Sequence, residues 1–234
     1  IGKWPNKAVA MAQPEQEARS GIDRLLQAAG WSVQDASAAN IFAARGVAIR
    51  EFPLPGHGFA DYLLYVDGAA AGVLEAKKAG STLSGVETQS DKYTKGLPEG
   101  LPRWGTPLPF SYQSTGIETR FTNGLDPTPR ARRVFAFHRP EHLADLLGSS
   151  GAAGRAADAA IPETFLARLQ HMPELVEEGL WPAQIKAIRN LEQSLADNRP
   201  RALIQMATGS GKTFTAISFI YRLIKFAGAR RVLF

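Results

Sequence analysis

Residues 60–78 read ADYLLYVDGAAAGVLEAKK and contain two apolar runs that are separated by Asp67-Gly68. An Asp-Gly pair between β-rich runs is a strong signal for a β-hairpin. The preceding residues, from Val47 onward, also form short β-rich runs, which PLPGHG interrupts. We therefore expect two antiparallel strands in 60–78, inside a larger sheet.

The hairpin would bring charged residues together. If the turn is a three-residue loop that begins at Asp67, Asp61 falls directly across from Glu75, with Cβ atoms about 4.5–5.5 Å apart. Two carboxylates at that spacing suit one shared Mg²⁺. Lys77 follows Glu75 by two residues and so shares its face of the strand. The metal would lower the pKa of a bound water, while Lys77 would orient the nucleophile or stabilise a pentavalent phosphate.

This pattern resembles the PD-(D/E)xK nuclease core, with Ala60 in place of the usual proline. A solvated hairpin with charges on its wet face is the alternative interpretation. Two features favour the nuclease interpretation. The apolar run before Glu75 is typical of a strand that enters a core, and Gln89 and Tyr93 lie one helical turn apart, on one face of a helix.

The surrounding sequence predicts an α/β domain with a mixed sheet flanked by helices. Residues 15–30 have apolar residues at helical spacing and end at Gly30, and 132–147 indicate a strand followed by a helix. Residues 148–162, GSSGAAGRAADAAIP, are small and indicate a flexible connection. We expect a nuclease-like domain over 1–147, a linker over 148–162 and a second domain over 163–234.

The second domain contains a phosphate-binding loop. It follows the apolar run 202–206, a predicted strand, and precedes an apolar helical pattern. Its glycines would let backbone N–H groups point at phosphates, Lys212 would neutralise β/γ oxygens, and the Thr213 hydroxyl would bind Mg²⁺. A Gly/Ser linker is the alternative, but the flanking patterns argue against it. The predicted loop residues are Thr208, Gly209, Ser210, Gly211, Lys212 and Thr213.

Met206 occupies the place of the first glycine in the strict motif. This departure resembles motif I of superfamily 2 helicases and translocases, which have RecA-like domains. Gln184 resembles the residue that reads the adenine edge in those motors, although it could be an ordinary glutamine at a helix start. In such motors the remaining catalytic motifs follow motif I, so we expect the chain to be the start of something longer, unable to turn over ATP alone.

The order of hairpin, helix, linker and motif I resembles the restriction subunit of type I restriction–modification enzymes, over Pro14 to Phe234. The resemblance implies an ATP- and Mg²⁺-dependent endonuclease and translocase of double-stranded DNA, which works with methyltransferase and specificity subunits. It also implies roles for Gln89 and Tyr93 in supporting the nuclease site or bound DNA. The family often has an acid in its first helix, for which Glu17 or Glu15 could serve, although a solvent-exposed helix charge without a catalytic role is the favoured interpretation of both.

Composition limits other interpretations. The chain has 234 residues, no cysteine and no long apolar run, so disulfides and a membrane span are not expected, and a cytoplasmic location is the default. The resemblance implies that the cell is prokaryotic. Residues 181–234 carry 9 Lys/Arg against 2 Asp/Glu, which suits polyanion binding. Two rival functions stay open: a motor with a DNA-binding, non-cleaving nuclease-like domain, and a nucleotide-binding regulatory protein without a DNA role.

Overall fold

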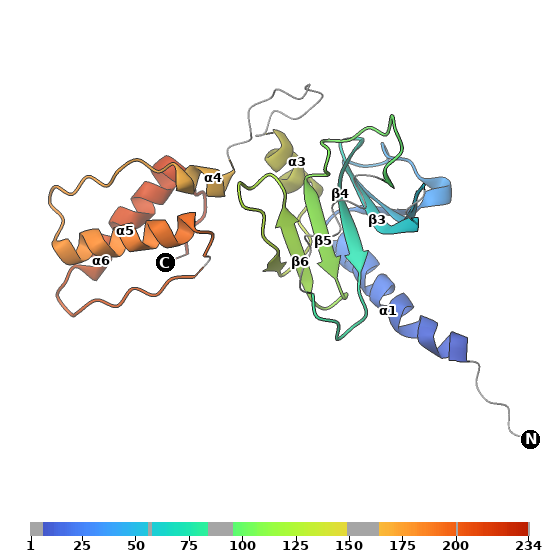
Figure 1. Cartoon of the computed structure of the whole chain (residues 1–234), viewed down its shortest axis with the longest axis horizontal. Helices are drawn as coiled ribbons and strands as arrows, with labels where there is room; N and C mark the ends of the chain where they lie inside the picture. The colour runs from blue at the N-terminus through green and yellow to red at the C-terminus, as the bar shows by residue number, and fades with distance from the viewer. Residues whose placement is uncertain (1–6, 56–57, 84–95, 149–163, 200, 234) are drawn as a thin grey trace, which may run out of the picture. The chain divides into compact units, whose positions relative to one another are not determined.

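The computed structural model divides the chain into two compact units, described separately below (Figure 1). One comprises residues 1–125 and 129–162, and the other comprises 126–128 and 163–234. In the first helix, side chains are described from Ala18 onward. The structure describes residues 7–55, 58–83, 96–148, 164–199 and 201–233.

The first unit is a seven-stranded sheet with helices, which confirms the predicted α/β class. Its elements are α1 (Lys7–Ala28), β1 (Ser32–Asp35), η1 (Ala36–Ala38), β2 (Gly46–Leu54), β3 (Gly58–Val66), β4 (Ala69–Ala76), β5 (Phe110–Ser114), β6 (Thr119–Asn123), β7 (Arg132–Val134) and α3 (Pro140–Gly148). The strands lie side by side in chain order, from β1 to β7. The pairs β1–β2 and β4–β5 are parallel and the other pairs are antiparallel, so the sheet is mixed.

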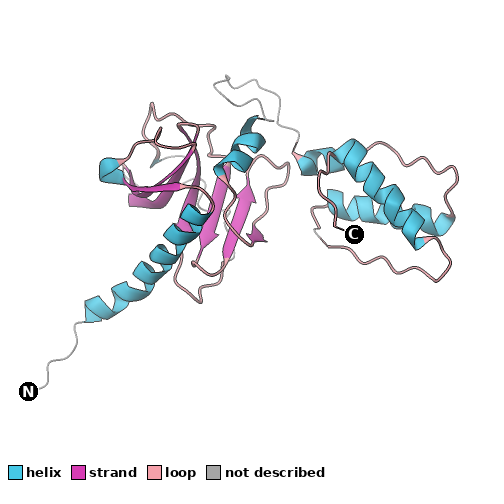
Figure 2. Cartoon of the chain, turned by 180° about the vertical axis from the view of Figure 1, so that it is seen from behind, coloured by secondary structure: helices cyan, strands magenta, loops and turns pink. Residues whose placement is uncertain are grey.

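Both faces of the sheet carry an apolar core. On one face, α1 and α3 (Figures 1 and 2) contribute Ile22, Leu26 and Leu143, which pack with alternate residues of the central strands. The other face is covered by loop residues such as Ile41 and Leu97. Because β3 and β4 lie between two cores, they are apolar along most of their length, and a polar side chain near their ends stands out.

The predicted hairpin is confirmed, but the predicted three-residue loop is wrong. Val66 pairs with Ala69, so the turn has two residues, Asp67 and Gly68, with φ angles of 49° and 79°. Both angles are positive, as a type I′ turn requires. The ladder then slips by one residue at Ala71, between Leu64 and Tyr65. This β-bulge absorbs the residue that the turn does not contain, and the register beyond it is the predicted one.

The second unit is helical in its described part. Its elements are α4 (Phe165–Gln170), α5 (Pro182–Ala196), α6 (Lys212–Arg222) and η2 (Leu223–Ala227). Ile188 of α5 and Leu166 and Leu169 of α4 are buried. The guanidinium of Arg168 closes the end of η2 by donating to the Ala227 carbonyl at 2.7 Å.

The strand predicted over 202–206 is not found among the described residues of this unit. The segment joins no sheet, and Leu203 is 93% exposed. Cavities of about 750 and 390 Å³ are lined in part by its residues. A strand exists through the ladder bonds to its neighbours, and no described segment pairs with this one. Residues 230–233 likewise join no strand in the described part of the chain.

The predicted linker, 148–162, lies outside the described residues except for Gly148. In the part of the chain that is described, no helix is both long and apolar enough to cross a membrane.

Candidate nuclease and nucleotide sites

Asp61 lies on β3, next to the end of its ladder with β4. Tyr62 pairs with Leu74, and continuation of that register places Asp61 across from Glu75. Both oxygens of Asp61 accept hydrogen bonds: Oδ2 from the Ala76 N–H at 3.0 Å, and Oδ1 from Arg19 at 3.1 Å. The Asp61 carboxylate is therefore held against the end of β4, the strand that carries Glu75.

Glu75 is the buried acid of the pair, with 6% of its surface exposed. The Lys77 ammonium lies 3.0 Å from its Oε2 as an ion pair, although that oxygen has no aligned hydrogen-bond donor among the described residues. The ion pair with Lys77 stabilises the ionised form of Glu75, because a carboxylate at this depth needs a cation nearby. The Lys77 N–H also donates to the Ser114 carbonyl at 2.8 Å, which extends the β4–β5 pairing past Ala76.

A small cleft opens beside these residues. Its volume is about 120 Å³, and it is lined by Ala18, Arg19, Asp61, Ala76 and Lys77. The structure thus brings Asp61 and Lys77 to one cleft, while Glu75 reaches it through its ion pair with Lys77. The catalytic roles of Asp61, Glu75 and Lys77 stay predictions.

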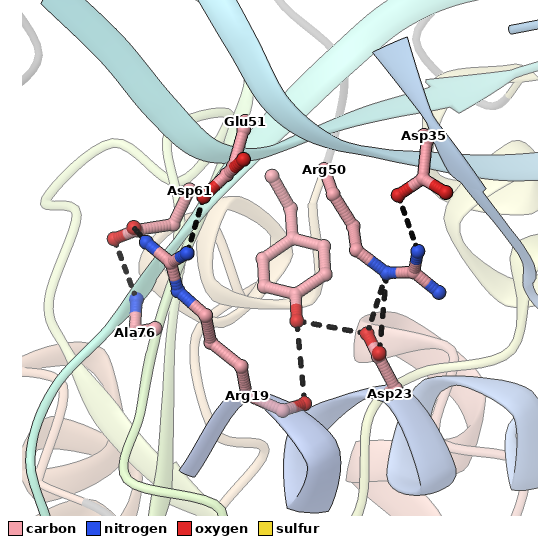
Figure 3. Close-up of polar contacts among 8 residues, drawn as sticks. Arg19, Asp23, Asp35, Arg50, Glu51, Asp61 and Ala76 are labelled. Carbon is pink, nitrogen blue, oxygen red and sulfur yellow. Dashed lines mark hydrogen bonds and ion pairs between the residues drawn. The ribbon is translucent and has the colours of Figure 1, made fainter. Parts of the chain in front are cut away.

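Helix α1 supplies partners to this site that the sequence patterns did not indicate (Figure 3). Arg19 donates from Nη1 to Glu51 and from Nη2 to Asp61, so its guanidinium lies between β2 and β3. Burial opposes the charge of Arg19, but hydrogen bonds and charges from Glu51 and Asp61 outweigh it and raise the pKa of the guanidinium. The helical spacing of Arg19 and Asp23, one turn apart, was the only available signal.

A second ion-pair cluster anchors the same helix (Figure 3). Arg50 on β2 bonds Asp23 on α1 at 3.1 Å and Asp35 on β1 at 2.5 Å. The Tyr62 hydroxyl donates to Asp23 at 2.8 Å. Burial, together with this bond to Asp23, raises the pKa of the Tyr62 hydroxyl well above its usual value. This cluster fixes α1 on the sheet and thereby fixes Arg19 at the cleft.

Four predicted residues are not placed by the structure. Gln89 and Tyr93 lie outside the described residues, and the side chains of Glu15 and Glu17 lie outside the described part of α1.

The predicted phosphate loop precedes α6, as expected. Gly209 and Gly211 have φ angles of 81° and 76°, and α6 begins at Lys212. The Lys212 ammonium donates to the Ala207 carbonyl at 3.2 Å, so it reaches back across the loop. The hydroxyl of Ser210 donates to the same carbonyl at 2.6 Å. Thr213 is exposed on the first turn of the helix, next to Lys212.

Gln184 is buried and connects α5 to this loop. Its Oε1 accepts the Trp181 N–H at 2.9 Å, and its Nε2 donates to the Ser210 carbonyl at 3.3 Å. Gln184 therefore acts both as a helix cap and as a support for the loop.

The residues present fit the cofactors that the sequence predicts. Two hard carboxylate ligands and substrate oxygens are a usual environment for Mg²⁺. Among the described residues no group of three or more His, Cys, Asp and Glu side chains is arranged to hold a metal, so these residue types would supply two ligands at most. The loop offers positive-φ glycines, a helix N-terminus and the Lys212 ammonium, which suit the phosphates of ATP.

Comparison with known proteins bears directly on both sites. Residues 35–104, which contain the hairpin, match the family described as the second domain of the type I restriction enzyme EcoKI endonuclease subunit. Residues 178–234, which contain Gln184 and the phosphate loop, match the family described as the type III restriction enzyme res subunit. The EcoKI endonuclease subunit of Escherichia coli (strain K12) is 29% identical over 269 aligned positions, which cover 94% of this chain. The chain is similar to the endonuclease subunit of type I restriction enzymes, HsdR. The predicted resemblance to the N-terminal part of type I restriction subunits is thereby confirmed.

Two further relatives are shorter or more distant matches. The EcoAI endonuclease subunit of Escherichia coli is 41% identical over 51 residues, 22% of this chain and 6% of that protein. A solved fragment assigned as an HsdR subunit from Vibrio vulnificus YJ016 has 23% identity and a TM-score of 0.41, and the match covers 92% of this chain and 38% of that one. The HsdR-like chain spans 22% of the length of the EcoKI subunit.

Proposed function

We propose that this chain contributes a Mg²⁺-dependent nuclease site and the nucleotide loop of an ATP-driven motor to a type I restriction enzyme that cleaves double-stranded DNA. Residues 1–147 would form the PD-(D/E)xK nuclease domain, 148–162 a linker, and 163–234 the start of a RecA-like translocase domain. The observation that carries the proposal is the strand register, whose continuation puts Asp61 across from Glu75, together with the cleft that Asp61 and Lys77 line.

The division of labour follows from the chemistry of each site. Asp61 and Glu75 would hold Mg²⁺, which supplies an activated water and stabilises charge on the scissile phosphate. Lys77 would orient the nucleophile or stabilise the phosphorane-like charge. In the motor, Lys212 would neutralise the β- and γ-phosphates of ATP, Thr213 would bind the Mg²⁺ of the nucleotide, and Gln184 would contact adenine.

The names of the relatives support the partners in this proposal. A type I restriction subunit would act beside methyltransferase and specificity subunits in the prokaryotic cytoplasm, and Gln89 and Tyr93 would support the nuclease site or bound DNA. Motor activity would drive DNA past the complex, and the nuclease would cut when movement stops.

A separation-of-function experiment tests the proposal in the assembled full-length enzyme. Glu75→Gln preserves the size of the buried side chain, so the fold should be retained, but it removes the charge that would bind Mg²⁺. We therefore expect loss of double-strand cleavage, with DNA-dependent ATP hydrolysis retained. Lys212→Ala should abolish both ATP hydrolysis and the cleavage that depends on it. Glu118→Gln, which removes a half-buried carboxylate that is paired with Arg120 and does not line the cleft, is the matched control and should leave both activities intact.

Each failure has its own meaning. Full cleavage by Glu75→Gln would eliminate the nuclease assignment. If the wild-type enzyme hydrolyses ATP when DNA is added but does not cleave DNA, the alternative of a non-cleaving DNA-binding domain is supported. If DNA does not change the rate of ATP hydrolysis, the alternative of a nucleotide-binding regulatory protein is supported.

A further inference from the structure

The guanidinium of Arg19 lies between carboxylates from two neighbouring strands (Figure 3). Nη1 donates to Glu51 on β2, and Nη2 donates to Oδ1 of Asp61 on β3 at 3.1 Å. The other oxygen of Asp61 accepts the Ala76 N–H at 3.0 Å. Both oxygens of the proposed metal ligand thus already have a donor within the chain.

The backbone of β2 departs from regular strand geometry at Glu51, the residue that pairs with Arg19. Arg50 pairs with Tyr62 and Phe52 pairs with Ala60, so Glu51 lies across from Asp61. The φ angle of Glu51 is 47°, in the left-handed region that glutamate rarely adopts. The register therefore holds a third acid in line with the two proposed ligands, and Arg19 bridges it to Asp61.

We infer that Arg19 is a positioning residue that weakens divalent-cation binding at Asp61 and makes that binding depend on DNA. This inference rests on the proposed nuclease function. A fixed positive charge 3.1 Å from a carboxylate oxygen opposes a second cation at the same carboxylate. Repulsion between the singly charged guanidinium and a divalent cation on the other side of one carboxylate lowers the affinity for the cation about tenfold, even at the dielectric constant of water.

Arg19 also orients Asp61, and orientation alone would strengthen cation binding. This second effect is the smaller one, because the Ala76 N–H already fixes the other oxygen of the same carboxylate. The charge effect therefore decides the direction.

DNA would relieve the repulsion. The Arg19 side chain is 39% exposed and lines the cleft together with Lys77. A guanidinium binds phosphate through paired N–H donors, so a phosphodiester that enters the cleft competes with Asp61 for Arg19. When Arg19 moves towards the phosphate, its charge no longer offsets that of Asp61, so Asp61 attracts the cation more strongly. The site then binds its cation most tightly when DNA is in place.

Direct titration of Mn²⁺ into the full chain, followed by calorimetry and by the electron paramagnetic resonance of free Mn²⁺, tests this inference without using cleavage. In the absence of DNA and nucleotide, Arg19→Gln should bind Mn²⁺ about tenfold more tightly than wild type. Arg19→Lys retains the charge and should stay within about twofold of wild type. Glu51→Gln removes a negative charge and leaves Arg19 to Asp61 alone, so binding should weaken severalfold.

Arg45→Gln is the matched control. It makes the same change of charge in the same unit, but its ion-pair partner is Asp67 in the hairpin turn, at 3.1 Å. A short DNA duplex should tighten Mn²⁺ binding to the wild type and to Arg45→Gln more than to Arg19→Gln.

The outcomes separate this inference from the proposed function. If Asp61→Asn abolishes Mn²⁺ binding but Arg19→Gln behaves like Arg45→Gln, the inference is overturned and the nuclease site stands. If Asp61→Asn leaves Mn²⁺ binding unchanged, the metal site fails and the proposed function fails with it. Circular dichroism checks that each variant is folded. If Arg19→Gln is unfolded, Glu51→Gln provides the test instead, and Mn²⁺ binding by Glu51→Gln as tight as that of the wild type would overturn the inference.

Discussion

Gln184 and Ser210 are joined by a hydrogen bond of 3.3 Å, from the side-chain amide to the main-chain carbonyl, so the start of α5 supports the predicted phosphate loop. The other end of the same amide accepts the Trp181 N–H. Close contact extends to Gly211, where an added Cβ would lie 2.2 Å from the Gln184 nitrogen. Glutamine at this position thus shapes the loop, whether or not it also contacts adenine.

Gln184→Ala should therefore weaken nucleotide binding by the full-length enzyme. Loss of the hydrogen bond that caps α5 and of the one to the loop should cost about 1 kcal/mol, which lowers nucleotide affinity about fivefold. Titration with fluorescent ATP and GTP analogues measures the effect. If Gln184 reads adenine, the variant loses a preference for ATP; if it supports the loop alone, both affinities fall equally. Gln193→Ala, on the exposed side of α5, is the control. Unchanged affinity for both nucleotides would contradict the support role.

Gly68→Ala should destabilise the first unit by about 1–2 kcal/mol, because a left-handed conformation is unfavourable for alanine. The φ angle of Gly68 is 79°, and an added Cβ would lie 2.4 Å from the ring of Phe42. Phe42 is exposed and can turn aside, so the backbone strain dominates. Urea unfolding measures the loss. Gly148→Ala, where an added Cβ meets no atom within 4 Å, should change stability by less than about 0.5 kcal/mol.

The hairpin shows how far the sequence could predict this fold. The Asp-Gly signal predicted the turn, and the register of Tyr62 with Leu74 agrees with the prediction that Asp61 lies across from Glu75. That agreement had a partly wrong basis, since a two-residue turn and a bulge at Ala71 replace the expected three-residue loop. The position of a bulge depends on how the strand packs against both cores, and local sequence patterns carry no information about that packing.

Contacts between distant elements were not predictable in this way. The bond from Arg19 to Asp61 joins residues 42 apart in sequence, and it depends on where α1 crosses the sheet. Periodicity predicted that α1 is amphipathic, but not which polar residues at its edge would face the strands. The strand predicted over 202–206 was wrong for the converse reason. The apolar run was clear in the sequence, but strand formation requires a neighbouring strand, and the described residues provide none.

Acid should destabilise the first unit through His138. Burial, with a smaller contribution from the neighbouring His142, lowers the pKa of His138 from 6.5 to about 4. Its ring nitrogen lies 2.7 Å from the hydroxyl of the buried Tyr112. Between these pKa values the unfolded chain binds the proton and the folded chain does not, so stability falls as pH drops from about 6.5 to about 4. The full loss from this residue is about 3 kcal/mol.

Urea unfolding at several pH values between 4 and 7 checks this expectation. His138→Gln should flatten the pH dependence, whereas His171→Gln, which alters a histidine that is exposed in the second unit, should not. Identical pH profiles for wild type and His138→Gln would contradict the assignment.

Removal of Glu192 should disrupt the second unit more than removal of any exposed acid. Arg222 is buried on α6 and pairs with Glu192 on α5 through two bonds, of 2.6 and 3.1 Å. The same guanidinium donates to the Pro173 carbonyl at 2.5 Å. Glu192→Ala would leave a buried cation with neutral acceptors, and the expected loss of stability is about 3–5 kcal/mol. Because α6 begins at Lys212, nucleotide affinity should fall as well.

Amide hydrogen exchange across α5 and α6 of the full-length enzyme measures this loss locally. The control is Asp197→Asn, since Asp197 pairs with the exposed Arg199 at 3.3 Å and such pairs contribute less than about 1 kcal/mol. A double variant, Glu192→Leu with Arg222→Met, should recover much of the stability, because it removes both buried charges and keeps apolar volume. Protection in Glu192→Ala equal to that in Asp197→Asn would show that the Arg222 pair does not hold α6 against α5.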